Sequence, residues 1–194
     1  MLSICIPIFN FDCTKLVQDI VEQVKASPEK VEVLVMDDAS EIHFQDKFKL
    51  LPEEVRFFQL KENVGRSRIR NQLAEAAKYN WLLFLDGDST IVRANYIEEF
   101  LSTIKGRNSF SVVCGGSVYQ NDPPPVNQML RWKYSKARER KSLSFSERHP
   151  YKSFTSNNIL VEKQTFLAIR FDERIEDYGH EDTLFGYQLM KKRI

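Results

Sequence analysis

The sequence has few cysteines, almost no net charge and no long apolar run, and each shortage excludes a class of protein. Its three cysteines, Cys5, Cys13 and Cys114, are widely spaced and form no Cys-x-x-Cys pair. This pattern argues against a disulfide framework and a zinc cage. The 28 basic and 27 acidic residues leave a formal charge of +1, so we expect no nucleic-acid partner.

Membrane insertion and secretion have little support in the sequence. No apolar stretch approaches the roughly 18 residues needed to cross a bilayer. The N-terminal segment MLSICIPIFNF has neither the basic region nor the small-residue cleavage site of a secretory signal. The cysteine usage fits a reducing compartment. We therefore expect a cytoplasmic protein, at most peripheral at the inner face of a membrane.

What is present is a regular alternation of apolar strands and amphipathic helices. The 194 residues suffice for one domain with a sizeable core. Short apolar runs predict strands at residues 2–9, 31–36, 55–60, 81–85 and 110–119, and apolar residues at helical spacing predict helices near 16–24, 69–77 and 97–104. This order predicts an α/β fold with a mainly parallel sheet covered by helices on both faces.

The last third of the chain follows a weaker pattern. Residues 122–125, Asp-Pro-Pro-Pro, predict a stiff loop. Residues 131–148 are basic with interleaved aromatics and predict a surface helix and a mobile loop. This stretch could face an anionic acceptor or an acidic membrane surface, although a solvated helix with Trp132 packed inward is the simpler interpretation. Order is expected again at 158–169 and in a helix from about Glu181.

Acidic residues directly follow two of the expected strands, as Asp37-Asp38 and as Asp86-Gly87-Asp88. In an open α/β sheet, ligands bind outside the carboxyl ends of the strands. Gathered carboxylates repel one another unless a cation lies among them, and their hard oxygens favour Mg²⁺ or Mn²⁺. The spacing of Asp86 and Asp88 places both on one side of an extended backbone, where Gly87 would let a ligand approach closely. The alternative is an acidic turn after a buried strand.

Five segments, in this order, resemble motifs of the family 2 glycosyltransferases, which have the GT-A fold. They are LSICIPIFN (2–10), VEVLVMDDAS (31–40), ENVGRSRIRNQLAEAA (62–77), WLLFLDGDS (81–89) and FDERIEDYGHEDTLFGYQL (171–189). The resemblance covers about residues 2–119 and 153–192. It implies a single GT-A domain over 1–194, with a nucleotide-sugar-binding half (1–119) and an acceptor and catalytic-base half (120–194). Because the chain stops at Ile194, we expect a small family member or a truncated catalytic core.

On the donor side, the resemblance implies a nucleotide pocket at the ends of the first two strands. Pro7 and Phe9 would line it, with the Phe9 ring against the base, and Asp38 would accept a hydrogen bond from uracil or ribose. Arg70 would hold the diphosphate at a helix N-terminus. The alternatives are a core aromatic for Phe9, and for Arg70 a solvated basic face shared with Arg66 and Arg68.

For the chemical step, the resemblance assigns roles to two further pairs of acids. Asp88 would be the direct ligand of Mn²⁺ or Mg²⁺, and Asp86 would touch the ribose or the metal, which offsets the charge of the leaving diphosphate. Asp182 would be the general base, with Glu181 binding the acceptor hydroxyl; a single base opposite the leaving group implies inversion. The alternative for this pair is an acidic first turn that suits the helix dipole. His180 replaces the family's usual glycine and is most simply a surface residue.

The resemblance as a whole implies an inverting, metal-dependent glycosyltransferase of the hexosyltransferase type. The expected donor is a nucleoside diphosphate sugar, in particular a UDP-sugar, and the acceptor a saccharide or lipid-linked saccharide in cell-surface polysaccharide or glycolipid assembly. One alternative is a sugar nucleotidyltransferase, which usually carries a glycine-rich basic loop where this chain has FNFDCTK. Another is an inactive nucleotide-sugar-binding domain. Asn157 and Asn158 precede a strand expected to run toward the site, as readers of sugar hydroxyls or as turn amides.

Overall fold

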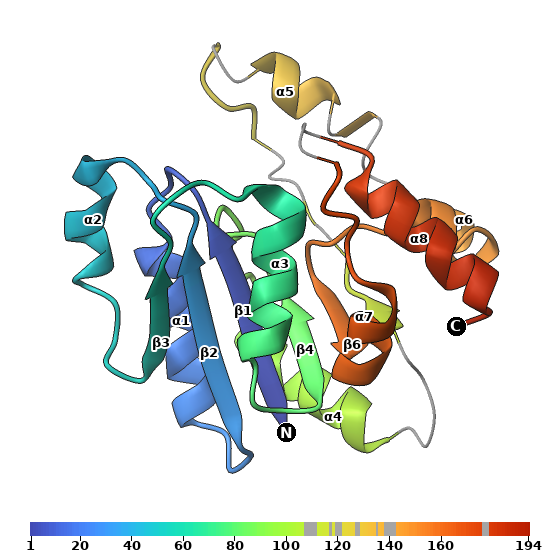
Figure 1. Cartoon of the computed structure of the whole chain (residues 1–194), viewed down its shortest axis with the longest axis horizontal. Helices are drawn as coiled ribbons and strands as arrows, with labels where there is room; N and C mark the ends of the chain where they lie inside the picture. Colours follow the sequence, from blue (N-terminus) through green and yellow to red (C-terminus); the bar gives the residue numbers. More distant parts are fainter. Residues whose placement is uncertain are drawn as a thin grey trace.

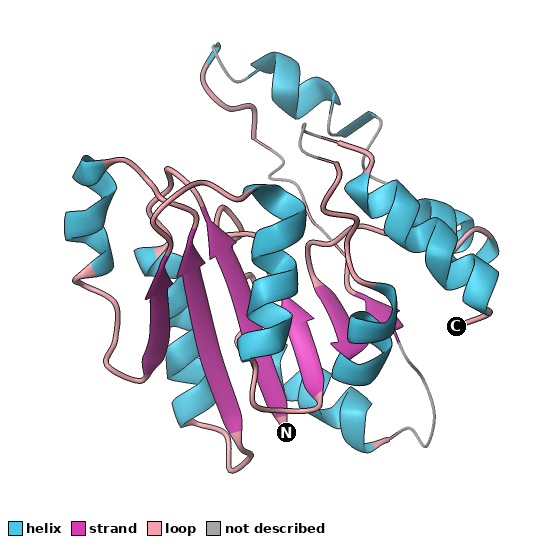
Figure 2. Ribbon diagram, viewed as in Figure 1, coloured by secondary structure: helices cyan, strands magenta, loops and turns pink. Residues whose placement is uncertain are grey.

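The computed structural model describes residues 1–106, 112–116, 118, 122–126, 129–134, 136–137, 143–175 and 179–194. A central sheet has the strand order β3-β2-β1-β4-β6-β5 and carries helices on both faces (Figures 1 and 2). The strands are β1 (Leu2–Ile8), β2 (Val31–Asp37), β3 (Val55–Gln59), β4 (Trp81–Phe84), β5 (Val112–Cys114) and β6 (Ile159–Glu162). The helices are α1 (Thr14–Lys25), α2 (Ile42–Phe48), α3 (Gly65–Ala76), α4 (Tyr96–Lys105), α5 (Met129–Tyr134), α6 (Leu143–Arg148), α7 (Lys163–Ile169) and α8 (Glu181–Lys192), with a 3₁₀ turn, η3, at Tyr151–Ser153. The predicted α/β class and mainly parallel sheet are confirmed.

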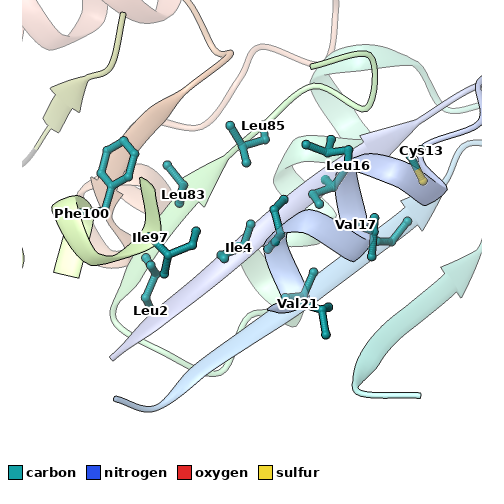
Figure 3. Packing of buried hydrophobic residues seen from close by; sticks show 14 of the residues in the cluster. Leu2, Ile4, Cys13, Leu16, Val17, Val21, Leu83, Leu85, Ile97 and Phe100 are labelled. Carbon is teal, nitrogen blue, oxygen red and sulfur yellow. The ribbon is translucent and has the colours of Figure 1, made fainter. Parts of the chain in front are cut away.

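Side chains of the central strands alternate between two apolar layers, because successive residues of a strand point to opposite faces. One layer joins the sheet to α1 and α4, and Figure 3 shows Leu2 of β1 beside Ile97 of α4. The other layer joins the sheet to α3, α7 and α8. Stacked aromatic rings strengthen it, including Phe171 and Phe185 at 4.7 Å between ring centroids. The inner strands β1, β2, β4 and β6 are therefore largely buried on both faces, which explains their continuous apolar runs.

The strand order reverses between β1 and β4, and this reversal places the site. β1 pairs in parallel with both β2 and β4, and β2 pairs in parallel with β3. The chain thus winds outward in one direction through β2 and β3 and in the other through β4. A crevice outside the carboxyl ends of the strands is expected at such a reversal. The segments that follow β1, β2 and β4 therefore lie at one edge of the sheet.

Two parts of the fold differ from what the sequence patterns predict. Residues 158–169 divide into β6 and α7, and β6 runs antiparallel to β4, pairing Phe84 with Ile159. The strand after Asn157 therefore runs away from the site edge, contrary to the expected direction, while Asn157 itself stays at that edge. Helix α2 has no counterpart among the expected elements, because only a few of its residues are apolar and of these only Phe48 is buried.

The expected strand at 110–119 is confirmed only as β5, whereas 107–111, 117 and 119–121 lie outside the described residues. The basic stretch 131–148 contributes to the two short helices α5 and α6. The mobile loop expected there falls partly on 138–142, which are also outside the described residues. Among the described residues, no helix is long and apolar enough to cross a membrane.

Candidate active site

The end of β1 lies at the strand-order reversal. Pro7 is half-buried and lies beyond the last β1–β4 pair, Cys5 with Phe84, so its missing N–H leaves no ladder bond to β4 unmade. Phe9 follows the strand and is 51% exposed. This exposure excludes the interpretation of Phe9 as a core aromatic and leaves its ring available for stacking on a planar ligand.

Gly87 is required by packing against β1. A Cβ at this position would lie 2.6 Å from Cγ2 of Ile8 and 3.4 Å from the carbonyl oxygen of Pro7. Such a contact is too short for two carbon atoms. Gly87 therefore permits the close approach between the Asp86–Asp88 turn and β1, and the expected approach of a ligand stays a prediction. This packing holds the two acids at the end of β1.

The acidic pair after β2 is used to build the turn and to start the next helix. Asp37 is fully buried and accepts hydrogen bonds from the N–H and hydroxyl of Ser40. The carboxylate of Asp38 accepts from the N–H of Val64 at 2.7 Å and of Gly65 at 3.0 Å. Burial raises the pKa of Asp38, while these two N–H groups act in the opposite direction. Asp38 thus caps α3, and its predicted hydrogen bond to uracil or ribose stays a prediction.

Two arginines of the first turns of α3 face the acid that follows β4. Arg70 is 2% exposed; its Nη2 donates to Asp86 Oδ1 at 2.5 Å, and its Nη1 donates to the carbonyl oxygen of Arg66 at 3.0 Å. Arg66 lies nearer to solvent, with its Nη2 3.9 Å from Asp86 Oδ2. Arg68 instead pairs with Glu173 on the surface. Arg70 therefore positions Asp86, and its predicted contact with the diphosphate stays a prediction.

Asp86 is also held through its backbone by the turn before β6. Its N–H donates to Oδ1 of Asn157 at 3.1 Å, and the hydroxyl of Ser89 donates to the same oxygen at 3.2 Å. Asn158 accepts from the Tyr96 hydroxyl at 2.6 Å and donates to the carbonyl oxygen of Gly116. Both amides are therefore turn amides in this structure, and Asn157 links the turn to the acidic triplet.

Asp88 is the exposed acid of the Asp86–Asp88 turn. Its side chain is exposed and makes no hydrogen bond or ion pair to the described residues. In the described part of the chain, no three acidic, histidine or cysteine side chains converge as a metal cage. Mg²⁺ is commonly held by one or two carboxylates plus substrate phosphates and waters. The predicted role of Asp88 and Asp86 as ligands of Mg²⁺ or Mn²⁺ stays a prediction.

The N-terminus of α8 brings the last two predicted acids to the same edge. Glu181 is buried and its Oε1 lies 3.0 Å from Nε of Arg66. Oδ1 of Asp182 is buried and has no hydrogen-bond partner among the described residues. Burial raises the pKa of Asp182, while Ser156 and the positive charge of Arg70 act in the opposite direction. A buried carboxylate with a raised pKa is suited to accept a proton.

The backbone conformation at His180 explains why a glycine is expected before this acidic pair. His180 is the N-terminal flanking residue of α8 and has a left-handed backbone, with φ of 69°. Such a backbone is strained for most side chains but free for glycine, and histidine is among the residues that tolerate it better. Its side chain is exposed, so the interpretation of His180 as a surface residue is confirmed.

Two further residues, Arg66 and Ser156, lie among these acids without a clear motif to mark them. The sequence pattern favours Arg70 over Arg66 as a ligand of the diphosphate, yet Arg66 faces both Asp86 and Glu181. Ser156 is 1% exposed, and its polar groups lower the pKa of Asp182, against the larger effect of burial. The only signal for Ser156 is its place in the polar turn Ser-Asn-Asn before a buried strand.

The fold, with acidic side chains at the carboxyl edge of its sheet, is that of a GT-A type domain. The family model of glycosyl transferase family 2 matches residues 3–170. The chain belongs to this family. Asp182 and its neighbours in α8 lie beyond the matched residues.

Comparison with solved structures shows the same fold. TarS 1–349 of S. aureus superposes with a TM-score of 0.61 at 17% identity, covering 95% of this chain and 53% of that one. The TarS 1–349 structures in complex with UDP and with UDP-GlcNAc each give a TM-score of 0.60 at 18% identity. The chain thus spans about half the length of this neighbour. No curated protein sequence matches the chain at a significant level.

Proposed function

We propose that the chain transfers a sugar from a UDP-sugar to an acceptor hydroxyl with inversion at the anomeric carbon. The observation that carries the proposal is the position of Arg66, which faces Asp86 after β4 and Glu181 at the start of α8. These contacts bring Asp86 close to the start of α8, where Asp182 follows Glu181. The TarS structures with UDP and UDP-GlcNAc support a uridine nucleotide as the donor class.

The described residues suit the steps of such a transfer. Phe9 offers an exposed ring for the base, and Arg66 a cation for the diphosphate. Asp182 takes the proton of the acceptor hydroxyl as the hydroxyl oxygen bonds to the anomeric carbon. The bond from that carbon to the diphosphate breaks, and its electron pair leaves with the diphosphate. Because one base acts opposite the leaving group, the configuration inverts.

Asp88, with Asp86 beside it, would hold the divalent ion in this proposal. When bound, a Mg²⁺ or Mn²⁺ ion would offset the negative charge that grows on the leaving diphosphate. Asp86 is kept in place by Arg70 and Asn157, independently of any ion. Glu181, paired with Arg66, would bind the acceptor hydroxyl from the other side of the crevice.

The proposed acceptor is a saccharide or lipid-linked saccharide of cell-surface polysaccharide or glycolipid assembly. Helix α5 supports a peripheral contact with a membrane that carries such an acceptor. Leu130 and Tyr134 are exposed on it, and Nζ of Lys136 lies 4.2 Å from the centroid of the Trp132 ring. Exposed apolar side chains next to lysines favour an anionic surface.

The first experiment is thermal unfolding with UDP, GDP, UDP-GlcNAc and GDP-mannose, with and without Mn²⁺. We expect UDP species to raise the Tm only when Mn²⁺ is present, because a ligand that binds the folded state stabilises it. Asp88→Asn should abolish this shift. The control Asp46→Asn changes an exposed aspartate of α2 that pairs with Lys49 and should keep the shift. If no nucleotide raises the Tm with or without Mn²⁺, the proposal is wrong.

A further inference from the structure

Two polar atoms without partners are buried beside each other at the acceptor side of the crevice. One is Oδ1 of Asp182 and the other is Oγ of Ser156, and neither has a hydrogen bond of normal length to the described residues. The polar groups of Ser156 are nevertheless near enough to lower the pKa of Asp182. Buried polar atoms are nearly always paired, so an unpaired couple needs an explanation.

The surrounding structure holds Ser156 next to Asp182. The ring of Phe154, two residues before Ser156, stacks on Phe185, one turn after Asp182 on α8, at 5.0 Å between centroids. Gly186 lets α8 approach η3, since a Cβ there would lie 2.5 Å from the carbonyl oxygen of Tyr151. The turn before β6 is therefore fixed against α8 by packing, and Ser156 is 1% exposed.

The next residue ties the same turn to the donor side. Asn157 accepts from the N–H of Asp86 at 3.1 Å, so consecutive residues serve the expected base and the expected donor-side acid. Ser156 has no other hydrogen-bond partner in the described residues, which leaves Asp182 as the group that its hydroxyl can serve.

We propose that Ser156 is a positioning residue for Asp182: its hydroxyl donates to Oδ1 in the working state, which fixes the carboxylate and directs the other oxygen at the acceptor. This inference rests on the proposed function, in which Asp182 is the base. A hydroxyl needs only to rotate to make this bond. The bond stabilises the carboxylate form and holds it in one orientation.

Other charged groups near Asp182 come from several elements and must be kept constant in a test. Arg70 of α3 stabilises its carboxylate form, and the adjacent Glu181 of α8 opposes it. Cys114 of β5 also lies within electrostatic reach, because the charge of Asp182 raises its pKa. Ser156→Ala removes one hydroxyl and leaves these three groups unchanged.

The test measures the pKa of Asp182 directly, by NMR titration of the chain labelled with ¹³C at aspartate carboxyls, with the signal assigned by Asp182→Asn. In Ser156→Ala we expect this pKa to rise; in Ser156→Thr, which keeps the hydroxyl, it should stay near the original value. The matched control is Ser153→Ala, since the Ser153 hydroxyl is also buried without a partner but is absent from the groups acting on Asp182. An unchanged pKa in Ser156→Ala overturns the proposal.

A second measurement uses UDP release from UDP-GlcNAc with water as acceptor. We expect Ser156→Ala to lower kcat about threefold to tenfold, the size of one lost hydrogen bond, with KM unchanged. The acid limb of its pH profile should move to higher pH. A raised KM with kcat unchanged would overturn the positioning role. Failure of the proposed function is separable, because it would show as no nucleotide-dependent Tm shift while the NMR titration still reports on Ser156.

Discussion

Asp182 serves the proposed chemistry as a carboxylate, but the burial of that carboxylate lowers the stability of the fold. Its carboxylate is needed as the proposed base, yet burial raises its pKa. A raised pKa means that the folded chain binds this proton more tightly than the unfolded chain does. The stability from this group is therefore full at low pH and is lost as the pH rises through the folded-state pKa. At neutral pH the buried charge destabilises the fold.

We therefore expect Asp182→Asn to lose transfer and gain stability. The rate of UDP release from UDP-GlcNAc should fall by about 10²-fold or more, as for loss of a general base. The Tm at pH 7 should rise by about 2–4 °C, since a gain of about 1 kcal/mol has this effect in a chain of this size. Thermal unfolding at several pH values checks the sign.

The difference in Tm between this variant and the original chain should shrink at low pH. There the Asp182 carboxyl of the original chain is protonated and neutral, as the amide of the variant is at every pH. An asparagine variant that is less stable than the original at pH 7 would contradict the account. Such a result would mean that the Asp182 carboxylate is stabilised in the fold by its neighbours more than burial destabilises it.

At the scale of elements, the turn after β2 determines how α3 begins. The N-terminal flanking residue of α3, Val64, offers no side-chain cap. The cap comes instead from Asp38, which is distant in sequence and accepts from the N–H groups of Val64 and Gly65. Because Arg66 and Arg70 follow within the next turns, the direction of this helix start sets the position of both guanidinium groups.

We expect Asp38→Ala to lower the free energy of unfolding by about 1–2 kcal/mol, because two N–H groups at a partly buried helix start lose their acceptor. Urea denaturation gives the value. The matched control is Asp12→Ala, since Asp12 accepts from the N–H of Thr14 at 3.0 Å at the start of α1 but is exposed. Its loss should cost less. Equal losses in the two variants would count against the buried cap.

The elements also show which features the sequence could predict. The strands were predictable because burial on both faces requires continuous apolar runs, as in residues 81–85. Helix α2 was not, because its apolar residues are too few to give a helical period. The direction of β6 could not be predicted either, because a pattern of buried residues is the same in both directions along a strand.

The site was predictable to a similar degree. The positions of Asp86 and Asp88 followed from the end of a strand, because parallel strands end at one edge. The partners of these acids did not follow. Arg70 reaches Asp86 across 16 residues and Asn157 reaches it across 71. Contacts between segments so far apart depend on how the helices and turns pack, which local patterns do not encode.

At the scale of the whole molecule, α3 lies between the turn after β4, which carries Asp86, and the start of α8, which carries Glu181. It packs on the sheet through the layer that also contains Phe171 and Phe185. Figure 1 shows it in front of the central strands, with α8 beyond β6 on the same side. Arg66 spans this gap, from the acid after β4 to the acid at the start of α8. The turn after β4 and the start of α8 are therefore linked by the partly exposed guanidinium group of Arg66.

Arg66→Gln tests this link, and Arg68→Gln on the same helix is its control, because Arg68 pairs with Glu173 on the surface. A role in donor binding alone would raise KM for UDP-GlcNAc and leave kcat unchanged. If Arg66 also links the start of α8 to Asp86, kcat should fall as well, by about tenfold. Glu181 and Asp182 would then lose the contact that holds them toward Asp86. Steady-state UDP release separates the two cases, since the loss of the guanidinium charge affects KM in both whereas only the loss of the link affects kcat.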